Sequence, residues 1–213
     1  MTQQGVDRLD SYGSSIDHKL DYMIGNREHG QLVHLDSGGN LEALLAQLLT
    51  PVRYAAGVRV SCAAAGDYAA LDVMSASATD TAGTATYVPN LARTAGGVVT
   101  FQTIRVKCSE DAVLTSLRLH FFNAAPLAAE VEMDDNAAFS IATAAGLAKH
   151  QGSVLLNAFV DIGVAESSSN TSGLQESFKC ATGQTGLWMV VTTEVAETNE
   201  TANMTLDFDF FTY

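Results

Sequence analysis

Histidine and cysteine side chains are the groups in this sequence that best suit nucleophilic or acid–base chemistry. The histidines are His18, His29, His34, His120 and His150, and the cysteines are Cys62, Cys108 and Cys180. Catalysis by either type needs a base and an orienting group beside the reacting atom. Cys180 has no histidine near it in sequence, so we expect a buried thiol there. His120 lies beside Arg118 in an alternating segment, and we interpret it as a polar position on a strand face.

Two groups of side chains have the types that bind metal ions. His29 and His34 are five residues apart, but no third ligand lies within reach in sequence. Asp134-Asp135-Asn136 is the densest cluster of side-chain oxygens, and Ca²⁺ prefers such oxygens. The cluster lacks the spaced acidic pattern of a dedicated calcium loop. We therefore expect a turn in which Asp and Asn side chains bond their own backbone.

Common catalytic signatures are missing from the sequence. There is no G-x-S-x-G, H-E-x-x-H, G-x-x-x-x-G-K-[ST] or G-x-G-x-x-G motif. A glycosidase would need two facing carboxylates and aromatic rings to stack a sugar, but aromatic residues are only 8% and Trp188 is the single tryptophan. The sequence predicts a protein that is not an enzyme, with no catalytic residue, no metal site and no cofactor.

The overall charge of the chain is strongly acidic. The 213 residues carry 11 Lys and Arg against 24 Asp and Glu, a formal net charge of −13. Hydrophobic residues make up 47% and charged residues 16%, which excludes wholesale disorder. Nucleic acids and anionic membranes need clustered Lys and Arg, so neither is expected as a partner. Residues 131–213 hold eleven acids and two bases, which fits either a solvated acidic face or steering toward a basic partner surface.

The number of cysteines and the first residues of the chain indicate the kind of cellular compartment in which the protein folds. Three widely spaced cysteines are odd in number, which indicates folding in a reducing environment. No signal-peptide pattern follows Met1, and no apolar run approaches the roughly 18 residues that span a bilayer. Asn170, Asn199 and Asn203 begin glycosylation sequons, which we interpret as polar turns.

Residues 1–50 differ from the rest of the chain. Residues 1–39 are polar and glycine-containing, and we interpret them as an extended arm. Asn40 is a good N-cap for a short amphipathic helix over residues 40–49, and Pro51 ends it. The helix has one apolar stripe, formed by Leu41, Leu44, Leu45, Leu48 and Leu49. A helix this short needs a surface to dock on, either its own domain or a neighbouring subunit.

From about residue 54 the hydrophobic period changes from 3.6 to 2, which is typical of half-buried strands. Alternating segments cover residues 58–62, 104–108, 117–121, 154–162, 188–193 and 204–210. In the segment 154–162, the residues expected to share a face are Val154, Leu156, Ala158, Val160 and Ile162. Turn residues separate these segments. Residues 51–213 are therefore predicted to form one all-β domain, a two-sheet β-sandwich of jelly-roll or Greek-key type.

Four stretches are familiar in order and spacing. They are residues 95–101 (AGGVVTF), 117–126 (LRLHFFNAAP), 133–139 (MDDNAAF) and 186–192 (GLWMVVT). With them, the chain from about Tyr54 to Tyr213 resembles a family of tailed-bacteriophage virion proteins that decorate or cement the capsid. The resemblance implies a protein made in the host cytoplasm that binds the major capsid protein on the capsid exterior and stabilises the shell. It also implies a homo-oligomer, most simply a trimer.

The arm and the leucine helix suit assembly, because an extended segment can reach a neighbour and become ordered on binding. We therefore expect the five leucines to make assembly contacts. A second interpretation is a tail- or fibre-associated adhesion module that binds host glycans through loop aromatics. The candidates for stacking sugars are Tyr68, Tyr87 and Trp188. A hydrolase on the same fold is a third, weaker interpretation.

Overall fold

The computed structural model describes residues 53–63, 67–76, 85–109, 116–157, 159–163, 166–197 and 204–213. These residues belong to one compact unit. The predicted arm, the predicted helix over residues 40–49 and its five leucines lie outside the described residues, so the proposed division at residues 50 and 51 stays a prediction. No helix of the described residues is long and apolar enough to cross a membrane.

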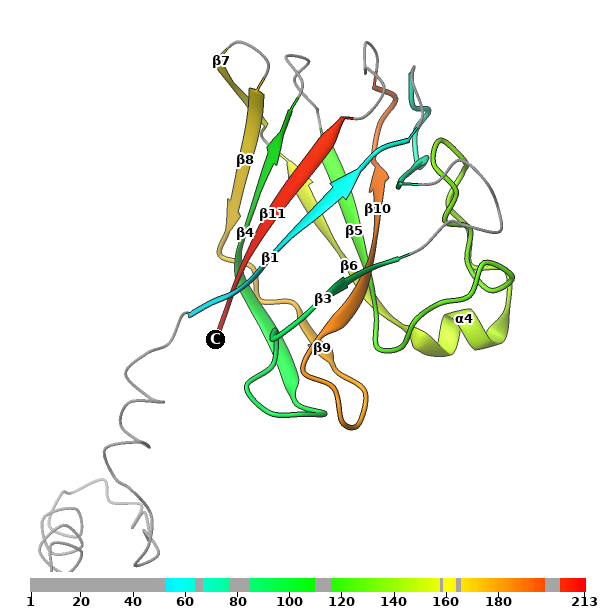
Figure 1. Ribbon diagram of the computed structural model, residues 1–213, viewed down its shortest axis with the longest axis vertical. Helices are drawn as coiled ribbons and strands as arrows, with labels where there is room; N and C mark the ends of the chain where they lie inside the picture. Colours follow the sequence, from blue (N-terminus) through cyan, green and yellow to red (C-terminus); the bar gives the residue numbers. More distant parts are fainter. Residues whose placement is uncertain are drawn as a thin grey trace, which may run out of the picture. The chain divides into compact units, whose positions relative to one another are not determined.

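Two antiparallel sheets make up the fold (Figure 1). The first sheet has the order β1 (Arg53–Ser61), β11 (Thr205–Thr212), β4 (Val98–Cys108), β8 (Glu166–Ser172) and β7 (Val160–Gly163), and β9 (Ser177–Lys179) pairs with the start of β4. The second sheet has the order β2 (Val73–Met74), β10 (Leu187–Thr193), β5 (Ser116–Phe122) and β6 (His150–Asn157), and β3 (Thr86–Val88) also pairs with β10. The helix α4 (Ala144–Lys149) precedes β6.

Strand pairing is nested about the middle of the chain. The first strand, β1, pairs with the last, β11, and β2 and β3 pair with β10. Further in, β4 pairs with β8 and β9, and β5 pairs with β6. One long antiparallel hairpin rolled into two sheets has this order, which is that of a jelly roll. The prediction of an all-β, two-sheet sandwich of jelly-roll type is confirmed.

Alternating side chains from both sheets fill the space between them. In β11, Leu206, Phe208 and Phe210 are buried, because strand residues two apart face the same side. The ring of Phe101 in β4 lies 4.9 Å from that of Phe121 in β5, joining the two sheets. All three cysteines are buried thiols that form no disulfide, as predicted.

A second apolar cluster covers the outer face of the second sheet. It is formed by Val73, Ala85, Phe122, Val131, Met133 and Val190. Val131 and Met133 lie in the long connection between β5 and β6, which also contains α4 and packs outside the sheet (Figure 1). The second sheet is therefore buried on both faces, which explains why Met189, Val190 and Val191 are all buried in succession. The outer face of the first sheet remains exposed.

The predicted strand 154–162 is wrong in one respect. The chain leaves the second sheet after Asn157 and enters the first sheet at Val160. Val160 and Ile162 are 60% and 50% exposed, whereas Phe159 is buried, so the alternation changes phase at the crossing. The hydroxyl of Ser169 in β8 donates to the Asn157 carbonyl at 2.6 Å and holds the two sheets together there.

Candidate functional site

His120 lies on the outer face of β5, beneath the connection between β5 and β6, and is only 8% exposed. Its ring stacks on Phe139 at 3.9 Å, and Nε2 lies 3.3 Å from the Thr192 hydroxyl. Nδ1 is buried and has no hydrogen-bond partner in the described part of the chain. Burial, with smaller contributions from nearby His150 and Arg118, lowers the pKa of His120 to about 3. The imidazole is therefore a neutral, packed ring on the outer face of the strand.

Arg118 and Glu194 form an ion pair beside this histidine. Arg118 donates from Nε and Nη2 to the two carboxylate oxygens of Glu194, at 2.6 and 2.8 Å. The hydrogen bond lowers the pKa of Glu194. Arg118 also donates to Ser153 at 3.2 Å, so its side chain braces β5 against both β10 and β6. Both charged groups are engaged with each other, which makes them structural.

The cluster Asp134-Asp135-Asn136 fastens the β5–β6 connection to β2. Asp135 accepts hydrogen bonds from the Tyr68 hydroxyl at 3.0 Å and from the Ser75 backbone at 2.7 Å. Asn136 adopts a positive φ of 62°, and its amide donates to the Asp67 carbonyl and the Asp72 carboxylate. A turn is present, as predicted, but the Asp135 and Asn136 side chains bond residues 67–75, where we expected bonds to their own backbone. Among the described residues, no three His, Cys, Asp or Glu side chains group as metal ligands.

Cys180 follows β9 and packs into the main core. Burial raises the pKa of its thiol. A thiol that stays protonated at neutral pH is a poor nucleophile, so the structure places Cys180 as the packed side chain that the sequence predicts.

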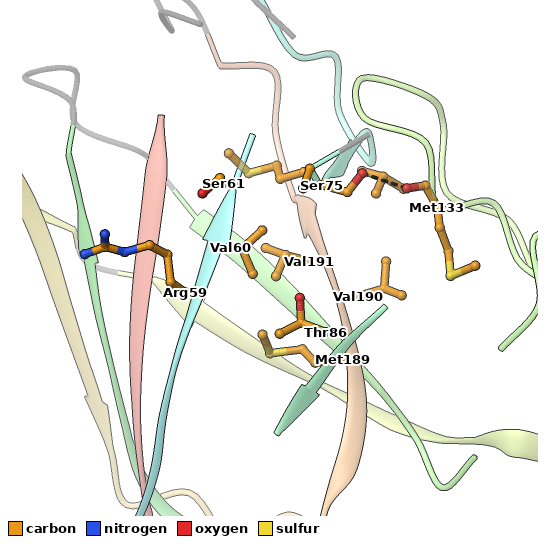
Figure 2. Close-up of a pocket in the computed structure, with 12 residues that line it drawn as sticks. Arg59, Val60, Ser61, Ser75, Thr86, Met133, Met189, Val190 and Val191 are labelled. Carbon is orange, nitrogen blue, oxygen red and sulfur yellow. Dashed lines mark hydrogen bonds between the residues drawn. The ribbon is translucent and has the colours of Figure 1, made fainter. Parts of the chain in front are cut away.

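A cavity of about 150 Å³ opens at the edge of the sandwich where β2 and β3 are separated along β10 (Figure 2). Met74, Met133 and Met189 line it together with several valines, and the hydroxyls of Ser61, Ser75 and Thr86 supply its polar atoms. The Ser75 hydroxyl is already bonded to the Met133 carbonyl at 2.8 Å. The lining side chains include no carboxylate, imidazole or thiol. The cavity therefore offers nothing for acid–base chemistry.

The exposed outer face of the first sheet carries rows of side chains that run across the strands. One row passes from Arg59 in β1 through Asp207 in β11 and Lys107 in β4 to Ser168 in β8. Arg59 binds both carboxylate oxygens of Asp207, at 2.6 and 2.8 Å, and this bond lowers the pKa of Asp207. Opposite charges therefore alternate across three neighbouring strands, which stabilises the pairing.

Two further rows lie beside this one on the same face of the sheet. One passes from Gly57 through Asp209 and Arg105 to Asn170, and the other from Tyr54 through Phe211 and Thr103 to Ser172. The Arg105 guanidinium lies 4.8 Å from the centre of the Phe211 ring, and Tyr54 meets the same ring edge-on at 5.6 Å. We call these three rows the ladder face. Sequence reasoning missed it, because partners such as Arg59 and Asp207 are 148 residues apart.

The three aromatic residues considered for sugar stacking are not free loop side chains. Tyr68 is 1% exposed, with its hydroxyl on Asp135. Trp188 in β10 is half-buried against the second apolar cluster, and its ring lies 5.1 Å from that of Tyr87 in the paired strand β3. These rings serve packing, which weakens the glycan interpretation.

Comparison with known proteins does not assign the chain to a family. No protein-family model matches the chain, and no curated protein matches it. The function is therefore inferred from the fold and from the surfaces of the described residues.

Proposed function

We propose that the chain is a structural protein of a tailed-bacteriophage virion, which decorates or cements the capsid exterior by binding the major capsid protein. The observation that carries the proposal is the nested jelly-roll strand order. Jelly rolls recur in viral capsid proteins and in lectins, so the architecture favours these two classes. The resemblance of residues 54–213 to phage decoration proteins points to the first.

The aromatic side chains support a shell role over glycan binding. Lectin-like recognition uses exposed rings that stack on sugars, whereas Tyr68 is buried and Trp188 packs on Tyr87. The adhesion module therefore stands as the second candidate. Only the jelly-roll architecture and the remaining exposed loops favour it.

The buried polar groups fit a structural role as well. Arg118 is bonded to Glu194, Asp135 to Tyr68, and the Cys180 thiol lies in the core. Each of these groups stabilises the sandwich through a protein partner or by packing. A shell component needs this rigidity because it bears load when the capsid is pressurised.

Copy number in the intact particle tests the proposal. Quantitative mass spectrometry of purified virions, with the major capsid protein as internal reference, should give hundreds of copies of this chain per particle. A few copies per particle, together with binding on a glycan array, would favour the adhesion module. Absence from purified particles would overturn the virion role altogether.

A further inference from the structure

We propose that the ladder face pairs with the ladder face of a second copy of this chain, about a two-fold axis that runs parallel to the strands between β4 and β11. The contact is isologous, so the same patch serves both copies. The inference goes beyond the virion role and does not depend on it, because it concerns the purified chain alone.

Charge is self-complementary about this axis. A two-fold rotation there exchanges β4 with β11 and β1 with β8. Lys107 of one copy then lies opposite Asp207 of the second copy, because these residues share a row. Arg105 likewise meets Asp209 of the second copy. Each copy supplies both members, so the contact holds four pairs of opposite charge and sets the register.

Side-chain size is complementary about the same axis. Arg59, which is 63% exposed, falls opposite Ser168 of the second copy. Tyr54 lies in the row that falls opposite Ser172, and its hydroxyl lies over Gly57 and bonds Asp209 of the same chain. Sheets that pack face to face lie about 10 Å apart, and large side chains opposite small ones fill that space without clashes.

The rest of the surface opposes self-association through any other face. The ladder face carries three basic and two acidic side chains, whereas the other described residues that are not buried include four basic and seven acidic ones. Two copies that met on the acidic surface would bring like charges together, which costs affinity. The ladder face is the large sheet surface on which two copies meet without that repulsion.

The paired strands supply most of the area of a typical interface. The axis brings β1, β11, β4 and β8 of the two copies opposite one another, and these strands contain 9, 8, 11 and 7 residues. At about 4.8 Å between strands and 3.3 Å per residue they cover roughly 550 Å². Stable complexes bury about 800 Å² on each partner, so the four strands supply about two thirds of a standard interface.

Sedimentation velocity on the full chain tests the pairing. The wild-type protein should sediment as a dimer at micromolar concentration and dissociate as salt is raised. Arg105→Asp places an acid opposite Asp209 of the second copy at two sites per dimer, and should weaken association about 100-fold or more. The swapped variant R105D/D209R restores opposite charges at both sites and should restore the dimer.

A matched control variant separates the effect of a position on the ladder face from the effect of the change in net charge. Arg93→Asp makes the same charge change at an exposed loop position and should leave the dimer intact. A monomeric wild-type protein would overturn the proposal. So would a trimer, which a two-fold contact alone cannot build, an oligomer whose mass R105D does not change, or equal loss of association in R93D and R105D. The copy number of the chain in virions is a separate measurement and fails or succeeds independently.

Discussion

His120 shows how burial of one titratable ring makes stability depend on pH. In the unfolded chain a histidine has a pKa near 6.5, whereas burial lowers the pKa of His120 to about 3, with His150 and Arg118 adding to the effect and Glu194 opposing it. Between these values the unfolded chain binds a proton that the folded protein does not. The free energy of unfolding therefore falls as pH drops below about 6.5, by about 2 kcal/mol at pH 5.

Replacing His120→Phe tests this dependence. Phe keeps the stack on Phe139 and removes both ring nitrogens, Nδ1 without a partner in the described residues and Nε2 at 3.3 Å from the Thr192 hydroxyl. Stability at pH 7 should therefore fall by no more than about 1 kcal/mol. Urea unfolding at pH 7 and pH 5 should show the variant losing about 2 kcal/mol less than the wild type over that interval. Equal losses in the two proteins would mean that His120 does not titrate in this way.

Asp135 accepts two buried hydrogen bonds, so replacing it should lower the stability of the fold. Asp135→Ala removes the acceptor of both the Tyr68 hydroxyl and the Ser75 amide and should lower the free energy of unfolding by about 3 kcal/mol. Tyr68→Phe removes one donor only and should cost about 1 kcal/mol. Urea unfolding measures both, with Asp161→Ala at an exposed position as control. A D135A loss no larger than that of D161A would contradict the fastening role.

At the scale of elements, Gly152 fixes how β6 passes over β9. It has a positive φ of 139°, and a Cβ there would lie 2.7 Å from Cε1 of Phe178. Gly152→Ala should therefore destabilise the fold by about 3 kcal/mol, through backbone strain and a displaced core ring. Gly173→Ala is the control, since its φ is +73° but no atom lies within 4 Å of the added Cβ. Thermal unfolding should rank G152A well below G173A, and the reverse order would rule out the steric account.

The elements that sequence could predict are those with one buried face. The alternation in 204–210 follows β11, where Leu206, Phe208 and Phe210 point into the core. Alternation could not separate β6 from β7, because a crossing between sheets changes phase without a Gly or Pro to mark it. It also could not foresee that β10 is buried on both faces, since the covering connection comes from 123–149.

The same limit applies to the candidate site. The buried thiols and the turn at residues 134–136 were predictable from residue type and spacing. The ladder face was not, because a row such as Arg59, Asp207 and Lys107 comes from three strands and depends on register. Register follows from the nested topology, which local patterns do not specify.

For the whole molecule, the fold changes how the acidity is understood. The sequence places the excess of acids after residue 130, yet Asp207 and Asp209 are balanced on the ladder face by bases from β1 and β4. The distribution in space, and not along the chain, therefore leaves one nearly neutral sheet face on an acidic protein. This is the face on which we propose that two copies pair.

Deletion of residues 1–50 tests whether the sandwich folds without the arm and whether the arm contributes to capsid binding. The described sandwich closes its own core with strands from β1 onward, so the truncated protein should keep the thermal midpoint of the full chain. If the arm adds a second point of attachment, its loss should weaken binding to purified capsids by at least about tenfold, because linked contacts multiply in avidity. Cosedimentation with capsids measures the binding.

The variant L44A/L48A leaves the arm in place and removes part of the leucine stripe, so it should reproduce most of the loss if the helix makes the contact. Capsid binding by the truncated protein at full strength would show that residues 1–50 take no part in attachment, and that the folded domain alone carries it.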